Sequence, residues 1–415
     1  RARNEPLMAL DAATSSWEPL RVLAFEPYDA GSHRQVRELI SEHSRHRWTW
    51  LTRPGRAWKW RMRLGAVELV EMLVEDPGPC DVIFATSLLS VADLRALLPS
   101  ELRQTPVVLY MHENQLAYPS GKRGEDPRDV HFGLTNLTSA LAADRVLWNS
   151  HWNLESFLRG VKDVLRHAPD LAMDVVGLLE RIRRRSVVVW PPTPEPPEHS
   201  DERAAIGEGA IPSNQRWGEA GRVLHKPAAA VRVVWPHRWE HDKGPDELLR
   251  LARQCREQGA AVRWTILGWS HERERPEPFE CFLEEFRDDI EHAGYVEDRS
   301  DYWRLLRRAD WVLSTARHEF FGIAVVEAVL AGCLPWLPDR LSYPEILPES
   351  ARGLSPFNPP DDAAAVRRTI ARHLEAARAP NAVRRLDEAL EEAAHAVRSR
   401  PGDVGRRTDD GLDSR

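Results

Sequence analysis

The chain contains 415 residues, of which 42% are apolar and 29% are charged, and its formal net charge is −7. This composition supports a sizeable core and excludes a largely disordered chain, and the length predicts two domains or three small ones. The net charge excludes a polycation that coats nucleic acid along its whole length. No apolar run is long enough for a transmembrane helix. Because the N-terminus lacks a signal-like stretch and the four cysteines are scattered, we predict a cytoplasmic protein with no membrane partner.

The first half of the chain alternates short apolar runs with helical patterns. We predict strands at 20–25, 48–52, 81–86, 106–111, 145–148 and 186–190, and helices at 33–46, 61–75, 91–98, 132–143 and 152–159. The strand runs are continuously apolar and rich in β-branched residues, which is typical of parallel strands buried on both faces. This alternation predicts a doubly wound α/β domain over residues 18–190.

A proline-rich segment interrupts this pattern, and we interpret residues 191–228 as a linker or insertion. The alternation then restarts. We predict strands at 231–235, 262–267, 294–296, 310–315 and 334–337, helices at 245–258, 279–292, 300–308 and 323–331, and one or two helices over 361–398. The prediction is therefore a second doubly wound domain over 229–350, C-terminal helices over 351–398 and a disordered tail over 399–415. Ligands of such sheets bind at the carboxyl ends of the strands, so the natural site is a cleft between the two domains.

Two turns that follow predicted strands have the composition of phosphate sites. Gly31 and Ser32 open a helix after the first strand, and free N–H groups at a helix N-terminus suit a phosphate. Arg238 and Lys243 lie in a loop that leads into a helix, where two cations suit a diphosphate. The alternatives are an ordinary strand-to-helix turn and a solvated basic loop. The absence of GxGxxG and GxxxxGK[ST] motifs argues against a dehydrogenase and a P-loop enzyme.

Carboxylates and a polar run supply the other candidates for catalysis and substrate binding. Glu319 precedes a predicted apolar helix and Glu327 lies within it. A buried carboxylate needs partners, and the hydroxyls of a sugar or ribose are suitable ones; the alternative is a helix with one exposed glutamate. After the fourth strand, the run from His112 through Glu113 and Asn114 predicts a loop that contacts substrate, although a single histidine is often structural.

Residues 43–63 (HSRHRWTWLTRPGRAWKWRMR) form a basic segment in which tryptophans are interleaved with arginines and a lysine, with no acidic residue. Basic side chains can bind RNA phosphates, and aromatic rings can stack on unpaired bases. The alternative is that Trp48 and Trp50 belong to the core of a strand. The candidate RNA contacts are Arg47, Arg53, Trp58, Lys59, Trp60 and Arg61.

Several sequence blocks together resemble the tRNA-queuosine α-mannosyltransferase group of the retaining family 4 glycosyltransferases. They include EPYDAGSH, HENQLAYP, WPHRWEHDKGPDELL, GYVEDRSDYWRLLRRAD and HEFFGIAVVEAVLAGC, and extend from about residue 21 to 348. The resemblance implies the α/β GT-B architecture, in which two Rossmann-like domains face each other across a cleft. It also implies GDP-mannose as the donor and the queuosine of a tRNA anticodon loop as the acceptor.

The resemblance further implies a role for each matching residue. Arg238 and Lys243 would hold the donor diphosphate, Glu327 the ribose hydroxyls, and Glu319 the transferred sugar. Gly31 and Ser32 would approach the phosphates from the other domain, and His112 would lie near the anomeric carbon. The remaining expected contacts are the backbone N–H groups of Phe320, Phe321, Gly322 and Ile323 on the donor side, and Glu113 and Asn114 on the acceptor side.

One departure from the family pattern is Ala30, where a second glycine is common before Gly31. The chain has no Asp-x-Asp motif, so we expect no metal and no cofactor other than the donor substrate. Two alternatives stay open. One is a family 4 enzyme that uses another nucleotide sugar and a glycan or lipid acceptor, and the other is a non-catalytic protein that binds RNA or a nucleotide sugar.

Overall fold

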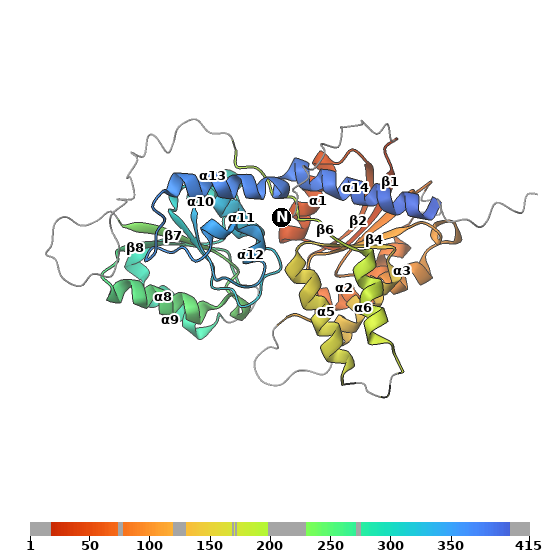
Figure 1. Ribbon diagram of the computed structural model, residues 1–415, viewed down its shortest axis with the longest axis horizontal. Helices are drawn as coiled ribbons and strands as arrows, with labels where there is room; N and C mark the ends of the chain where they lie inside the picture. Colours follow the sequence, from red (N-terminus) through yellow and green to blue (C-terminus); the bar gives the residue numbers. More distant parts are fainter. Residues whose placement is uncertain are drawn as a thin grey trace, which may run out of the picture.

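The computed structural model describes residues 18–73, 78–118, 130–167, 170, 172–197, 230–270 and 275–398. Two parallel sheets form two lobes that lie side by side (Figure 1). The strand order is β2-β1-β3-β4-β5-β6 in the N-terminal lobe and β11-β10-β7-β8-β9 in the C-terminal lobe. No helix among the described residues is long and apolar enough to span a membrane. Most of the predicted linker 191–228 and the predicted tail 399–415 lie outside the described residues.

The N-terminal sheet is buried on both faces because its strands are apolar at consecutive positions. Leu23 and Phe25 pack on one face, while Val22 and Ala24 pack on the other, as alternate side chains of a strand must. The strands are β1 (Arg21–Asp29), β2 (Arg47–Pro54), β3 (Val82–Thr86), β4 (Val107–Met111), β5 (Arg145–Trp148) and β6 (Ser186–Val188). The α-helices are α1 (Gly31–His43), α2 (Trp58–Glu71), α3 (Val91–Leu97), α4 (Val130–Ala142), α5 (His151–Leu165) and α6 (Val175–Arg185).

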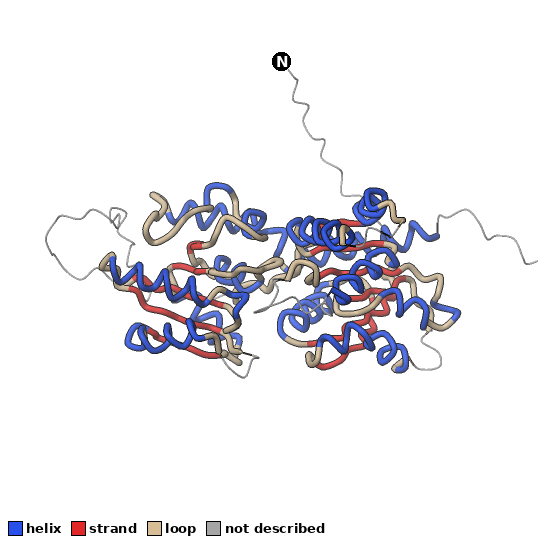
Figure 2. The backbone as a smooth tube through the Cα atoms, turned by 90° about the horizontal axis from the view of Figure 1, so that it is seen from below, coloured by secondary structure: helices blue, strands red, loops and turns tan. Residues whose placement is uncertain are grey.

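The C-terminal lobe has one core, which includes the buried rings of Trp235, Trp264 and Trp311 on three neighbouring strands. Figure 2 shows strands flanked by helices in this lobe as in the other. The strands are β7 (Val231–Pro236), β8 (Val262–Leu267), β9 (Ile290–Gly294), β10 (Trp311–Leu313) and β11 (Leu334–Trp336). The α-helices are α8 (Pro245–Glu257), α9 (Glu277–Glu285), α10 (Arg299–Arg308), α11 (Ile323–Leu330), α12 (Tyr343–Ile346), α13 (Ala363–His373) and α14 (Ala379–Arg398).

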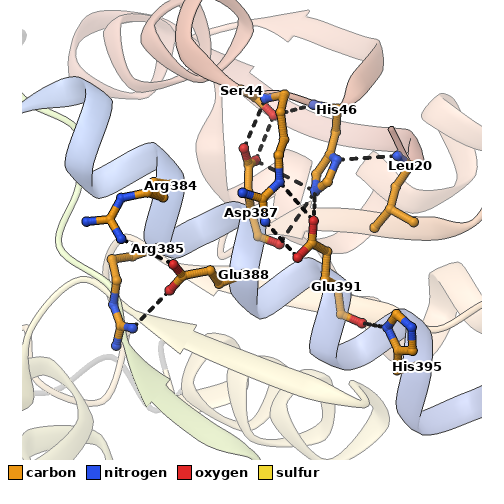
Figure 3. A network of polar contacts seen from close by, with 10 residues as sticks. Leu20, Ser44, His46, Arg384, Arg385, Asp387, Glu388, Glu391 and His395 are labelled. Carbon is orange, nitrogen blue, oxygen red and sulfur yellow. Dashed lines mark hydrogen bonds and ion pairs between the residues drawn. The ribbon is translucent and has the colours of Figure 1, made fainter. Parts of the chain in front are cut away.

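The last helix, α14, returns to the N-terminal lobe and packs beside α1 (Figure 1). Its apolar residues, including Leu386 and Leu390, complete the core on the second face of the N-terminal sheet. A polar network fixes the contact (Figure 3): the two carboxylate oxygens of Asp387 accept hydrogen bonds from Ser44 Oγ at 2.7 Å and from the Arg45 N–H at 3.0 Å. The C-terminal helices therefore join the two lobes.

Two element predictions in the C-terminal lobe are wrong. The helix predicted at 279–292 ends at Glu285, and β9 occupies 290–294. The strand predicted at 294–296 is therefore displaced toward the N-terminus. A short 3₁₀ turn, Arg287–Asp289, separates the helix from the strand. In the N-terminal lobe, α6 is a helix that the sequence pattern did not predict.

Candidate active site

A cleft of about 2410 Å³ is lined by residues of both lobes. The loops that line it follow the carboxyl ends of strands: Gly31 comes after β1, His112 after β4, Arg238 after β7, and Glu319 after β10. This is the position at which parallel α/β sheets bind ligands. The structure therefore brings together the main donor-site candidates from both halves of the sequence.

Lys243 lies at the centre of the polar contacts in the C-terminal lobe. Its Nζ donates to the His318 carbonyl at 3.0 Å and lies 3.3 Å from Glu319 Oε2 and 3.2 Å from Asp242 Oδ2. Burial opposes the charge, but Glu319 and Asp242 outweigh it and raise the pKa of Lys243. The lysine is therefore a fixed, protonated cation that lines the cleft.

Gly244 lets the chain turn from Lys243 into α8. Its φ is +67°, and a Cβ there would lie 2.2 Å from the Thr315 carbonyl oxygen, so a side chain at this position is excluded. Arg238 also lines the cleft, pairs with Glu240 Oε2 at 3.2 Å, and has a side chain that is 44% exposed. Of the expected pair of cations, Lys243 is thus held by contacts within the protein, while Arg238 is accessible to a ligand.

Glu327 is buried in α11, with an exposed fraction of only 2%, so the alternative of an exposed glutamate is wrong. Its Oε1 accepts from Arg299 Nη2 at 2.7 Å and from Gln35 Nε2 at 2.8 Å, and its Oε2 accepts from Tyr302 Oη at 2.8 Å. The sequence analysis missed these three partners. Arg299 and Tyr302 are three positions apart near the start of α10, a spacing that places them on one helix face. Gln35 comes from the other lobe.

Gly322, with a φ of +90°, precedes α11 and places Phe320, Phe321 and Ile323 at the cleft. Most of the Phe320 and Phe321 side chains is buried. The Phe320 carbonyl accepts a hydrogen bond from Ser150 Oγ of the N-terminal lobe at 2.5 Å. The loop between Glu319 and α11 therefore contacts both lobes.

Gly31 starts α1 with a φ of +52°, and no heavy atom lies within 4 Å of where its Cβ would be. The space in front of the helix N-terminus is therefore open, and the exposed Ser32 lies beside it. Ala30, the departure from the family pattern, is accommodated by Gly55, where a Cβ would lie only 2.2 Å from the Ala30 Cβ. The absence of a side chain at Gly55 thus makes room for the methyl group of Ala30.

His33 connects two carboxylates on the N-terminal side of the cleft, a role that the sequence analysis missed. Its Nδ1 lies 3.2 Å from Glu26 Oε2 and its Nε2 lies 3.3 Å from Glu113 Oε2. Burial would lower the pKa of His33, but Glu26 and Glu113 outweigh burial and raise that pKa well above its ordinary value. We call Glu26, His33 and Glu113 the carboxylate–histidine triad.

The ring of His112 lies 4.3 Å from that of His33, centroid to centroid. Burial and the charge on His33 lower the pKa of His112 well below its ordinary value, so His112 is neutral at pH 7. Ligand atoms of Glu26, His33 and His112 lie within 4.8 Å of one another, close enough to share a metal ion. In the described arrangement, however, His33 already uses both ring nitrogens for carboxylates.

The raised pKa of His33 predicts how stability depends on pH. Because this pKa exceeds the unfolded value of about 6.5, the ion pairs stabilise the fold fully below about pH 6.5. Their contribution is lost as the pH rises through the folded pKa. We expect His33→Gln to lower Tm most near about pH 6.5 and progressively less at alkaline pH, as thermal melts over this range can measure. A pH-independent difference would show that His33 is neutral.

The structure does not support the prediction that Asn114 contacts the acceptor. Its side chain is fully buried, and its Nδ2 donates to Asn153 Oδ1 at 2.7 Å and to Ser156 Oγ at 3.2 Å. These bonds fix the loop after β4 to α5 and leave Asn114 unable to touch a ligand. Glu113, by contrast, lines the cleft as expected.

The basic segment 43–63 divides into a buried part and an exposed part. Trp48 and Trp50 stack on each other at 4.9 Å and pack against Phe84, so they are partly buried against the core of the sheet, in keeping with the alternative. Glu68 pairs with Arg61 and with Arg53, whose Nε lies 2.7 Å away. Arg53 and Arg61 are therefore neutralised within the protein, which weakens the prediction that they bind RNA phosphates.

The exposed part lies at the start of α2. Trp60 is 69% exposed. The Trp58 ring packs on Phe132 at 5.2 Å, and Lys59 Nζ lies over both rings at 5.5 and 5.6 Å. Trp58 and Lys59 line the cleft, while Arg47 is exposed on β2. An aromatic and basic surface thus adjoins the cleft on the N-terminal side.

Comparison with known proteins identifies the family. The family described as tRNA-queuosine alpha-mannosyltransferase N-terminal matches residues 21–193, and the one described as Glycosyl transferases group 1 matches residues 223–392. The tRNA-queuosine alpha-mannosyltransferase of Drosophila melanogaster is 36% identical over 329 residues, which cover 79% of this chain and 82% of that protein. This chain belongs to the tRNA-queuosine alpha-mannosyltransferase family. It is therefore a glycosyltransferase, as the sequence predicted.

This family member also has a more distant relative in bacteria. The GDP-mannose:cellobiosyl-diphosphopolyprenol alpha-mannosyltransferase of Xanthomonas oryzae pv. oryzae is 27% identical over 155 residues, which cover 36% of this chain and 41% of that protein. The Drosophila relative thus shares far more of its length with this chain.

Solved structures confirm the predicted α/β GT-B architecture of this family member. Anabaena HepE in complex with UDP has 16% identity and a TM-score of 0.53, with 91% of this chain and 95% of that chain covered. Sucrose-phosphate synthase from Thermosynechococcus elongatus has 16% identity and a TM-score of 0.54, with 91% and 97% covered. At such low identity these likenesses establish the fold alone.

Proposed function

We propose that this enzyme transfers mannose from GDP-mannose, with retention of the anomeric configuration, to the queuosine of a tRNA anticodon loop. The observation that carries the proposal is the 36% identity over 82% of the Drosophila tRNA-queuosine alpha-mannosyltransferase. The name of the Xanthomonas relative supports GDP-mannose as the donor. The four cysteines, which all lie among the described residues, are scattered and form no disulfide, and this supports a reducing compartment such as the cytoplasm.

The geometry supports a donor that spans the C-terminal side of the cleft. We propose that Lys243 and Arg238 bind the diphosphate, and that Gly31 and Ser32 approach it from the N-terminus of α1. Glu327 binds the ribose hydroxyls, and Glu319 binds hydroxyls of the mannose. No metal is needed in this scheme, because the two cations and the helix N-termini stabilise the negative charge of the departing diphosphate.

In the proposed reaction, the bond between the anomeric carbon and the diphosphate oxygen breaks as a bond to the acceptor oxygen forms. The proton of the acceptor hydroxyl passes to the departing diphosphate on the same face of the sugar. His112 is neutral because of burial and its charged neighbour His33, so it can hydrogen-bond to the sugar without adding a second charge. GDP and the mannosylated base are the products.

A labelling experiment tests this function. The full chain is incubated with GDP-[¹⁴C]mannose and queuosine-containing tRNA, and the same tRNA with guanosine in place of queuosine is the matched control. We expect label in the queuosine-containing tRNA only. UDP-glucose and UDP-N-acetylglucosamine, tested as donors, should give no transfer. Label in a lipid or a free glycan, but not in tRNA, would refute the proposed acceptor.

The exposed ring of Trp60 gives a prediction for tRNA binding. Loss of one base-stacking contact costs about 1–3 kcal/mol, so Trp60→Ala should raise KM for tRNA by about 5- to 100-fold while KM for the donor stays unchanged. Val176→Ala is the control, because Val176 is an exposed apolar residue that does not line the cleft. Steady-state kinetics with each substrate varied would decide, and an unchanged KM for tRNA would exclude Trp60 from the interface.

A further inference from the structure

The carboxylate–histidine triad gives the N-terminal side of the cleft a surplus negative charge. Two carboxylates share one imidazolium, because Glu26 Oε2 and Glu113 Oε2 lie 3.2 and 3.3 Å from the two nitrogens of His33. Both carboxylate oxygens of Glu26 have partners within the protein, because its Oε1 accepts a hydrogen bond from the Tyr28 N–H at 2.8 Å. A partly buried charge without a counter-ion is costly, so this charge favours a cationic ligand.

Glu113 is the member of the triad that a ligand can reach. Its side chain is 14% exposed and lines the cleft, whereas that of Glu26 is 1% exposed. Ser87 Oγ donates to Glu113 Oε1 at 3.0 Å, and His33 binds the other oxygen. Each carboxylate oxygen can accept a second hydrogen bond. Glu113 is thus held in one orientation with acceptor capacity left over.

Tyr118 links the surroundings of Glu113 with the C-terminal side of the cleft. Burial and then Glu113 raise the pKa of Tyr118, and charges of the C-terminal lobe, including Arg238 and Glu319, act on the same phenol. The Tyr118 ring also packs on His318 at 4.4 Å, centroid to centroid. Glu113 therefore lines the same cleft as the groups proposed to hold the donor.

Queuosine carries a cation whose charge is complementary to this carboxylate. Its cyclopentenediol is joined to the 7-deazaguanine ring through a methylene group and a secondary amine, which is protonated at neutral pH. The hydroxyls lie only a few bonds from that nitrogen. We propose that Glu113 binds the secondary ammonium of the acceptor and thereby holds the diol toward the donor. This makes Glu113 a specificity-determining residue, and the inference rests on the proposed function.

Two tRNAs that differ in this charge test the inference directly. One carries 7-aminomethyl-7-deazaguanine at the acceptor position, which is cationic, and the other carries 7-cyano-7-deazaguanine, which is neutral. Neither has a diol, so both act as inhibitors of transfer to queuosine-containing tRNA. We expect the cationic tRNA to inhibit the wild-type enzyme at least about tenfold more strongly. Equal inhibition by the two tRNAs would overturn the inference.

A Glu113→Gln variant tests whether Glu113 causes the stronger inhibition by the cationic tRNA. Glutamine keeps the shape and an acceptor for Ser87 but removes the charge, so the difference between the two inhibitors should fall to about twofold or less, and KM for queuosine-containing tRNA should rise about tenfold or more. The control is Glu38→Gln, because Glu38 lines the same cleft and its side chain is 60% exposed. A tenfold difference that persists in Glu113→Gln would exclude Glu113 as the recognising group.

Further readouts keep the two proposals apart. Thermal shift with GDP should be the same for the wild type and Glu113→Gln, which shows that the variant is folded and that its donor site is intact. If Glu113→Gln does not fold, the inhibitor comparison in the wild type alone decides. If the wild type does not label queuosine-containing tRNA, the proposed function fails. If it labels this tRNA but inhibition is equal for the two inhibitors, only the role of Glu113 fails.

Discussion

Replacement of Lys243 by methionine is expected to lower kcat by about 10²–10³-fold, the usual cost of removing one preorganised group that stabilises charge in a transition state. The ammonium group lies within 3.3 Å of the Glu319 carboxylate and lines the cleft beside Arg238. In the proposed reaction, negative charge develops on the departing diphosphate at this place. Methionine keeps most of the length of the side chain and removes the ammonium group, including its hydrogen bond to the His318 carbonyl.

Stability has to be measured together with activity. Without Lys243, the carboxylates of Asp242 and Glu319 lose their shared cation, so we also expect a lower Tm. Rates should be compared at a temperature at which circular dichroism shows both proteins folded. Lys162→Met, which removes an exposed lysine from α5, is the control. A kcat within about fivefold of the wild type would show that Lys243 does not act on the leaving group.

The sequence predicted the sheets and the loops of the site because both depend on local signals. Consecutive apolar residues marked β3 and β4, which are buried along their whole length. Parallel strands place their carboxyl ends at one edge of the sheet, where the sequence analysis expected the site. The resemblance implied that Arg238, Lys243 and Glu319 share a donor site at this edge, and the structure brings them together because β7 and β10 are neighbouring strands.

Contacts between distant segments could not be predicted in the same way. His33 and Glu113 are 80 positions apart, and Gln35 and Glu327 are 292 positions apart. A polar run also does not show which of its side chains point inward. In the run after β4, Glu113 lines the cleft while its neighbour Asn114 is fully buried. The hydrogen-bond partners on α5 decide that difference.

The wrong helix boundary in the C-terminal lobe has a similar cause. Phe279, Phe282, Phe286 and Ile290 are spaced by three or four positions, as on one face of a helix. Ile290 instead pairs with Trp264 in the sheet as the first residue of β9. Both environments are apolar, so periodicity alone could not distinguish the end of the helix from the start of the strand.

Glu327→Gln is expected to raise KM for the donor by about 10- to 100-fold while kcat changes little. The proposed partner of Glu327 is the ribose, which is remote from the bond that breaks. A contact of this kind stabilises the ground state and the transition state equally, so its loss changes KM. Loss of a charge-assisted hydrogen bond to a buried carboxylate costs about 1.5–3 kcal/mol, which gives the stated range.

Companion variants show whether the effect comes from the carboxylate itself. Tyr302→Phe removes the hydroxyl that donates to Glu327 Oε2 at 2.8 Å, so it should raise KM for the donor less than Glu327→Gln does. Glu284→Gln, an exposed carboxylate on α9, should change neither constant. Isothermal titration with GDP measures the same loss without turnover. A variant in which kcat falls and donor affinity is unchanged would place Glu327 at the reacting sugar, because only a contact made in the transition state lowers kcat alone.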